Sequence, residues 1–176
     1  QWNEATERIK QLIARLGGSK EQGTELSSNP RLKQLLIDRA RIVKNADGKV
    51  ALALKVLKEN YKPGQKWIVY CDNINQLKAV LLQALAAGFD AYEYYAGMQG
   101  DRDTTLDYFE ANGGVLISIK CLDEGVDIPS TTHALILASS QNPREFIQRR
   151  GRILRRSDGK LFAHLFDAIT LPVISE

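Results

Sequence analysis

Short apolar runs alternate with amphipathic segments from residue 62 onward, and this alternation constrains the fold more than any other feature of the chain. Five runs have the composition and length of strands: residues 67–70, 91–95, 115–119, 133–137 and 161–166. Helical patterns lie between them at residues 74–87, 103–110 and 143–153. Strands that are buried on both faces read as continuous apolar runs, with helices as the crossover connections. The sequence therefore predicts an α/β fold, in which helices flank both faces of a parallel sheet.

The first 60 residues have the pattern of helices only. Residues 4–16 place apolar side chains at helical spacing. A second helix is expected to begin at Asn29-Pro30, because Asn suits a cap and Pro suits the first turn. Asp47 is the expected cap of a third helix, and Asp103 that of the helix over residues 103–110. The sequence thus predicts a small helical segment ahead of the sheet.

Composition and the rarer residues exclude several classes of protein. The hydrophobic share is 44% and the charged share 26%, as in an ordinary soluble globular protein. No apolar run approaches the roughly 20 residues of a membrane helix, and the absence of a signal peptide makes a cytoplasmic location the expectation. Cys71, Cys121, His133 and His164 are too scattered for a zinc site. Because the chain begins with Gln1 rather than Met, we expect it to start within a longer protein.

The net charge of +3 is concentrated in one segment. Between Arg144 and Lys160 the chain has seven basic and two acidic residues. Gln148, Arg152 and Arg155 are spaced i, i+4 and i+7, so they share one helix face. Like charges this close repel each other, and such a cluster is typical of an anion site. A nucleic-acid backbone, nucleotide phosphates and a merely solvated basic face are all compatible with this pattern.

The phosphate-binding loop of nucleotide-hydrolysing motors is absent from this sequence. The loop requires GxxxxGK[ST], and neither Gly-Lys pair of the chain has that context. The Asp-Glu pair at residues 123–124 does not follow a strand of its own as a magnesium-binding acidic box would. The chain therefore combines an arginine cluster with no means of its own to hold ATP and magnesium in the usual way.

A second candidate motif lies in the segment that follows the expected strand over residues 115–119. Gly125 permits a close approach of the backbone, Asp127 can accept a hydrogen bond from a ribose hydroxyl, and Pro129 stiffens the exit. A tight turn with a solvated acid is the alternative interpretation. In a parallel sheet this segment lies at the carboxyl edge, where ligands bind.

Together these segments resemble the C-terminal RecA-like domain of superfamily 2 helicases and translocases. Residues 122–129 (LDEGVDIP) are similar to motif V of that family, and residues 148–155 (QRRGRILR) fill every fixed position of its motif VI, QRxGRxxR. Residues 71–73 fall where motif IV belongs, and the helix with Arg102 is similar to the one before motif V. The resemblance covers about residues 49–167 and is strongest to the restriction-type and XPB-like branch, whose members act on DNA.

The resemblance implies roles in ATP hydrolysis. Arg152 and Arg155 match the two motif VI arginines that reach the phosphates of ATP as arginine fingers, and Gln148 matches the glutamine at the same interface. ATP itself, with Mg²⁺, would be held by an N-terminal RecA-like domain that is missing from this chain. The chain then divides into residues 1–47, a helical connector or accessory segment, and residues 48–176, the helicase C-terminal RecA-like domain.

The resemblance also implies a grip on nucleic acid, with DNA expected over RNA. Gly125 and Asp127 match motif V positions near the ribose of ATP and on the path that couples the two domains. Asn73 and Lys120 belong to loops that contact the nucleic-acid backbone. One position departs from the family, because Ile119 stands where a threonine is common.

Two functions of different classes follow. The first is the C-terminal half of an ATP-dependent helicase or translocase, inactive as an isolated chain. The second is a non-catalytic nucleic-acid-binding module that retains the fold alone. A self-sufficient hydrolase is not expected, because no nucleophile–base pair stands out in the sequence. Motifs IV and V preceding an intact motif VI favour the first function.

Overall fold

The computed structural model describes residues 1–16, 29–46, 48–119, 128, 130–138 and 160–170. It consists of two compact units, Gln1–Ala46 and Asp47–Glu176. Among the described residues, no helix has the length and apolar character needed to cross a bilayer.

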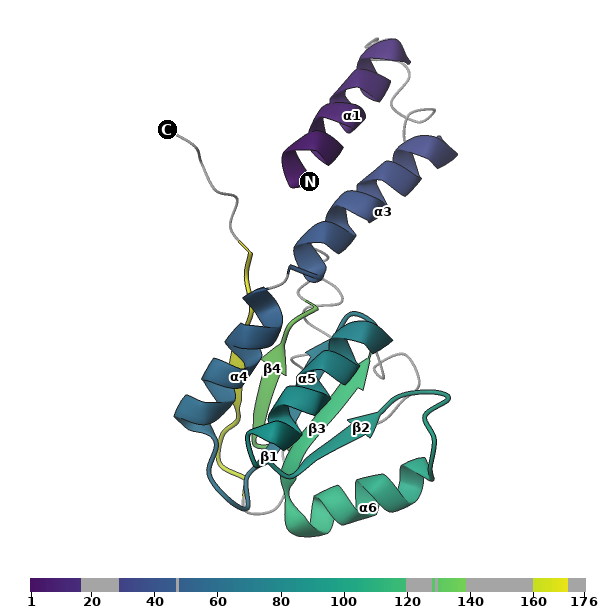
Figure 1. The fold of residues 1–176 in the computed structure, drawn as a ribbon. Helices are drawn as coiled ribbons and strands as arrows, with labels where there is room; N and C mark the ends of the chain where they lie inside the picture. The colour runs from purple at the N-terminus through teal and green to yellow at the C-terminus, as the bar shows by residue number, and fades with distance from the viewer. Residues whose placement is uncertain (17–28, 47, 120–127, 129, 139–159, 171–176) are drawn as a thin grey trace. The chain divides into compact units, whose positions relative to one another are not determined.

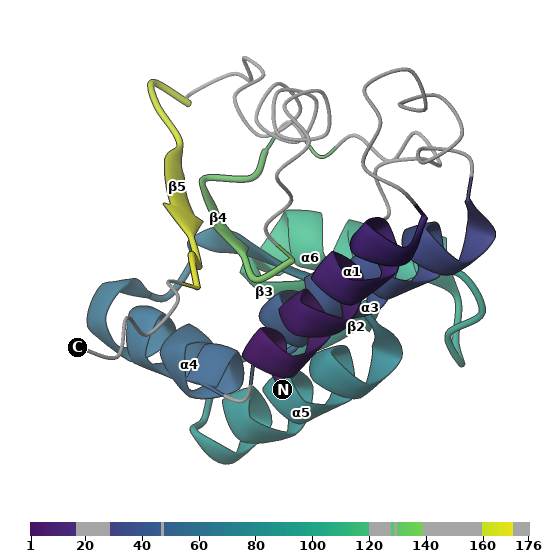
Figure 2. The same ribbon diagram turned by 90° about the horizontal axis from the view of Figure 1, so that it is seen from above.

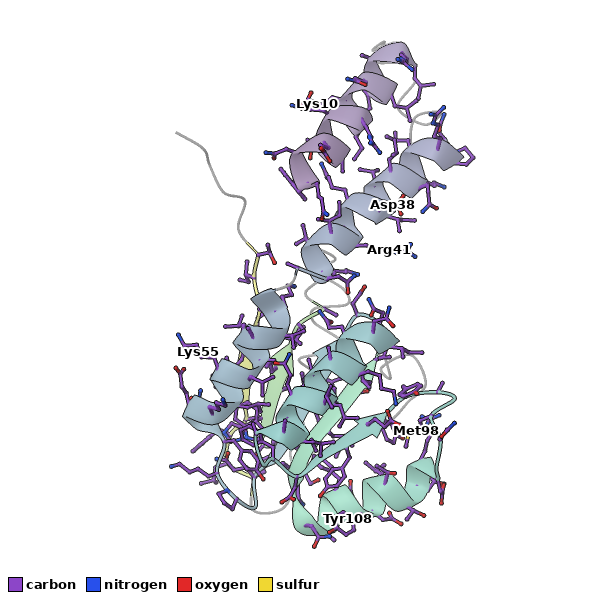
Figure 3. All side chains as sticks on the ribbon, viewed as in Figure 1. Lys10, Asp38, Arg41, Lys55, Met98 and Tyr108 are labelled. Atoms are coloured by element: carbon purple, nitrogen blue, oxygen red, sulfur yellow. The ribbon has the colours of Figure 1, made fainter. Side chains whose placement is uncertain are left out.

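The first unit contains two helices that lie side by side, α1 (Trp2–Arg15) and α3 (Pro30–Lys44). As expected from the sequence, the side chain of Asn29 caps α3: its Oδ1 accepts from the backbone N–H of Leu32 at 3.0 Å. Charged side chains are exposed on this pair, and Figure 3 shows Asp38 and Arg41 projecting from α3. Their 3.7 Å ion pair is exposed to solvent and therefore contributes little to stability.

The second unit is built on a sheet of five parallel strands, as the alternation of apolar runs predicted. The strand order is β2-β3-β1-β4-β5. The strands are β1 (Lys66–Cys71), β2 (Ala91–Tyr94), β3 (Gly114–Ile119), β4 (His133–Ile136) and β5 (His164–Asp167). The most buried strands, β1, β3 and β4, occupy the three central positions, in agreement with their continuous apolar sequences.

Helices cover both faces of the sheet, which makes this a three-layer α/β architecture (Figure 2). On one face, α4 (Gly48–Asn60) and α5 (Ile74–Ala86) contribute Leu57 and Leu77 to a core with Trp67 and Val69 of β1. On the other face, Phe109 of α6 (Arg102–Asn112) packs into a second core whose members alternate along the strands with those of the first. The two cores bury most of the central strands, while the outer strands β2 and β5 are only partly buried.

Two expected element boundaries are wrong. The cap of α6 is Asp101 and not Asp103: Oδ1 of Asp101 accepts from the N–H of Asp103 at 3.2 Å, and its Oδ2 from Thr104 Oγ1 at 2.6 Å. The last strand begins at His164 and not at residue 161, because β4, its pairing partner, begins only at His133. Leu161, placed in the strand by its apolar character, is 92% exposed.

The amino-terminal edge of the sheet contains a glycine pair at the entry to β3. Gly113 and Gly114 have φ angles of +78° and +110°. The chain passes between the starts of two neighbouring strands here: Gly114 N–H donates to the Gln65 carbonyl at 2.9 Å, and Val115 N–H to the Asp90 carbonyl at 2.8 Å. A Cβ on Gly114 would lie 2.6 Å from the Asp90 carbonyl oxygen, so this passage requires glycine.

Aromatic rings stack across three neighbouring strands near the same edge. Trp67 lies on His133 with ring centroids 4.6 Å apart, and His133 lies on His164 at 4.8 Å, both nearly parallel. Burial, which has the largest effect, and the electrostatic influence of the neighbouring His164 lower the pKa of His133 to about 4. The imidazole of His133 is therefore neutral at physiological pH, and it serves as an aromatic packing element.

Candidate nucleotide and nucleic-acid site

Three adjacent strands end together at the carboxyl edge of the sheet. Their order is β3-β1-β4, and the pairing of Cys71 with Ile119 and of Tyr70 with Ile136 aligns the strand ends. Every site residue predicted from the sequence follows one of these strands along the chain: Asn73 follows β1; Lys120, Gly125 and Asp127 follow β3; Gln148, Arg152 and Arg155 follow β4. The carboxyl edge of a parallel sheet is the usual location of ligands in such folds.

Asn73 is the predicted site residue that lies within the described part of the chain. It lies two residues after the end of β1 and caps α5, with Oδ1 accepting from the N–H of Gln76 at 3.0 Å. The buried Gln76 reaches back, and its Oε1 accepts from the N–H of Asp72 at 2.9 Å. These two bonds fix the turn between β1 and α5. Asn73 thus has a structural role that the sequence analysis did not assign to it.

The other predicted site residues lie outside the described residues: Lys120, Gly125, Asp127, Gln148, Arg152 and Arg155. The same holds for Asp47, the expected cap of α4, and for the expected helix over residues 143–153. The structure does describe Ser118, which precedes the motif V segment, and Ile128, which belongs to it. Ser118, near the end of β3, is 2% exposed, and Ile128, within the motif, is 7% exposed and packs in the α6-side core.

Sequence analysis missed Lys49, a charged residue close to the carboxyl edge. Lys49 lies in the first turn of α4 and is only 4% exposed. Its Nζ donates to the backbone carbonyl of Leu137, directly after β4, at 2.5 Å. A signal was present, because Lys49, Ala53 and Leu57 are spaced i, i+4 and i+8, and so the lysine continues the inward stripe of the helix. Lysine is so rarely buried that this position reads as a solvated one.

Two further side chains near this edge, Arg102 and Cys71, are held by packing within the domain. The guanidinium of Arg102 lies 5.0 Å from the centre of the Tyr94 ring, which joins the start of α6 to the end of β2. Burial, and to a lesser extent Asp72, raises the pKa of the Cys71 thiol to about 12, so this thiol is not a nucleophile at neutral pH. In the part of the chain that the structure describes, no cluster of three or more His, Cys, Asp or Glu side chains could hold a metal ion.

A five-stranded parallel sheet with helices on both faces, and three motif-bearing strands ending at one edge, define this unit as a RecA-like α/β domain. Residues 48–157 match the model of the helicase conserved C-terminal domain. The chain belongs to this family, and the resemblance stated from its motifs is confirmed.

Curated relatives include both RNA and DNA enzymes. The chain is 27% identical to the ATP-dependent RNA helicase HAS1 of Saccharomyces cerevisiae, over 70% of this chain and 25% of that protein. It is 35% identical to the DNA 3'-5' translocase XPB2 of Sulfurisphaera tokodaii, over 36% of this chain and 15% of that protein. The chain therefore spans a quarter or less of the length of these relatives. Their names do not support the expectation of DNA over RNA.

Solved structures agree on the fold. The C-terminal domain of the DEAD-box protein Dbp5 superposes with a TM-score of 0.57 at 20% identity, over 72% of this chain and 73% of that one. The Escherichia coli DEAD-box protein SrmB superposes with a TM-score of 0.56 at 20% identity, over 69% and 70%. At this identity the likeness shows the fold, while the residues of the site must be argued from this chain.

Proposed function

We propose that this chain is the C-terminal half of an ATP-dependent nucleic-acid helicase or translocase. In this proposal, an N-terminal RecA-like domain of the same protein holds ATP and Mg²⁺, and the present domain closes over the nucleotide. The observation that supports the proposal most is the alignment of β3, β1 and β4, because their three exits lead into motifs V, IV and VI in that order across the sheet. A composite site needs these segments at one edge.

Arg152 and Arg155 would act on the phosphates of ATP. A guanidinium group is planar, permanently charged and able to donate two parallel hydrogen bonds to phosphate oxygens. When the two domains close, it would stabilise the charge that develops on the transferred phosphoryl group, an effect worth about 10³–10⁵ in rate where arginine fingers are used. Gln148 lies on the same helix face by its spacing and would orient groups at this interface.

The motif IV and motif V segments would contact both the nucleotide and the nucleic acid. They would thereby couple ATP binding and hydrolysis to nucleic-acid binding. Gly125 permits a close approach of the backbone to the nucleotide, and Asp127 would accept a hydrogen bond from the ribose. Lys120 and the amide of Asn73 would contact backbone phosphates, which makes binding weaken with salt. Because the names of the relatives divide between RNA and DNA, the proposal covers both nucleic acids and the experiment compares them.

The proposal is tested in the full-length protein by Arg152→Ala, with Arg150→Ala as the matched control from the same cluster. We expect Arg152→Ala to reduce the nucleic-acid-stimulated kcat for ATP by about 10³-fold or more, with binding of single-stranded DNA and RNA nearly unchanged. Arg150→Ala should retain most of the kcat. If Arg152→Ala hydrolyses ATP as the wild type does, the finger role is wrong.

The same experiment separates the motor from a non-catalytic module. A module would show no nucleic-acid-stimulated hydrolysis in the full-length wild type, while Arg150→Ala and Arg152→Ala would weaken binding alike. The isolated chain of residues 1–176 should hydrolyse ATP only at the background rate, because ATP and Mg²⁺ would be bound by the N-terminal RecA-like domain. Residues 1–47 would then connect the two halves or form an accessory to this one.

A further inference from the structure

Lys49 is a buried cation that the proposed mechanism does not use. It is 4% exposed, although lysine is almost never fully buried without a partner. It also lies in the first turn of α4, where the helix dipole disfavours positive charge. Burial and position both oppose the ammonium group, so a specific acceptor must compensate for them.

The carbonyl of Leu137, which lies directly after β4, is an acceptor for this ammonium group. The distance from Nζ to the carbonyl oxygen is 2.5 Å, and both residues are buried. Charge-assisted hydrogen bonds are stronger and more directional than neutral ones, most of all away from water. Lys49 therefore orients the peptide unit through which the chain leaves the sheet.

The backbone at this point is fixed from the other side as well. The N–H groups of Leu137 and Ala138 both donate to the carbonyl of Tyr70 in β1, at 2.9 and 3.2 Å. Ala138 is 2% exposed, so the exit from β4 remains inside the molecule. With the bond from Lys49, the exit is tied to β1 by backbone contacts and to α4 by one side chain.

We propose that Lys49 is a positioning residue for ATP hydrolysis, which acts by fixing the Leu137 carbonyl where β4 leads into the segment that contains Arg152. This inference rests on the proposed function, because Arg152 must act on ATP for its placement to matter. A misplacement of about 1 Å remote from the chemistry can cost about 10²-fold in rate. Loss of the Lys49 bond should therefore lower kcat and leave the affinity for nucleic acid almost unchanged.

The test uses the full-length protein with Lys49→Met, which keeps the length and apolar stem of the side chain but removes its donor. We expect the nucleic-acid-stimulated kcat to fall about 10- to 100-fold, with KM for ATP changed by less than about threefold. The matched control is Leu57→Ala, on the same helix and in the same core but without a bond to the β4 exit. Measured well below its melting temperature, Leu57→Ala should retain its kcat.

The double mutant Lys49→Met with Arg152→Ala separates positioning from general weakening. If Lys49 acts through Arg152, the double mutant should be no slower than Arg152→Ala alone. If the two losses multiply, or if Leu57→Ala at equal loss of stability is as slow as Lys49→Met, the inference is overturned. Should Lys49→Met fail to fold, Lys49→Leu, which also lacks a donor, takes its place in the same comparison. An Arg152→Ala variant of full activity would instead refute the proposed function.

Discussion

Replacing Gly114 by alanine should destabilise the sheet by two separable effects. The first is conformational, since its φ of +110° is strained for any residue with a side chain, at a cost of about 1–3 kcal/mol. The second is steric, because the new Cβ would lie 2.6 Å from the Asp90 carbonyl oxygen and 2.9 Å from Cε2 of Tyr92. The first of these atoms belongs to the backbone and cannot swing aside.

Relief of this contact would stretch the two backbone hydrogen bonds that lead the chain into β3. These are the bonds from Gly114 to Gln65 and from Val115 to Asp90, each worth about 0.5–1.5 kcal/mol. Together with the conformational strain, we expect Gly114→Ala to lower the free energy of unfolding by about 3–5 kcal/mol. Gly88→Ala is the matched control, because Gly88 has a φ of +82° but no atom within 4 Å of the new Cβ.

The assay is urea unfolding of the 176-residue chain followed by circular dichroism. For an m-value of about 2 kcal/mol per molar, Gly114→Ala should lower the midpoint by about 2 M, with an unchanged slope. Gly88→Ala carries the conformational part alone, so it should cost about 1–2 kcal/mol. Equal losses for the two variants would refute the steric argument, and a loss below about 0.5 kcal/mol for Gly114→Ala would refute both parts.

Two further predictions concern His133 and Asn73. Because the pKa of His133 is lowered to about 4, the unfolded chain binds more protons than the folded one between that value and about 6.5. The free energy of unfolding should therefore decrease as the pH falls from 6.5 towards 4. His133→Gln should flatten this part of the stability profile, and an unchanged profile would contradict the assignment. Asn73→Ala should cost about 1 kcal/mol through loss of the α5 cap. Asn73→Asp should preserve the cap yet weaken nucleic-acid binding in the full-length protein, because it places a carboxylate before backbone phosphates. Equal binding by the wild type and Asn73→Asp would remove Asn73 from the nucleic-acid contact.

The central strands were predictable because their residues are apolar without a break. β1 and β3 have helices packed against both faces, so nearly all their side chains are buried and their sequences are apolar almost throughout. β5 pairs on one side with β4 and is half-buried. Its apolar sequence therefore overstated its length, and Leu161 proved to be exposed. The apolar pattern therefore located the fully buried strands well and overextended the half-buried β5.

A candidate site could be proposed from the sequence where chemistry requires fixed residue types. Motif VI needs arginines at set positions, so a single sequence is enough to propose Arg152 and Arg155, which lie outside the described residues and stay a prediction. The choice between Asp101 and Asp103 as the cap of α6 depended on backbone geometry that spacing does not record. Lys49 was missed because its role depends on a carbonyl 88 positions away in the chain. A backbone carbonyl can accept a hydrogen bond whatever the side chain of its residue. The sequence therefore does not indicate which residue accepts such a bond.

The stack of Trp67 on His133 makes the molecule its own optical probe. The chain has two tryptophans, and the other, Trp2, belongs to the first unit. In a Trp2→Phe variant, all indole emission would come from one ring held 4.6 Å from an imidazole across the junction of β1 and β4. Separation of these strands would move the indole from a buried ring stack into water and so change its emission. The unfolding of this sheet can thus be timed without an attached dye.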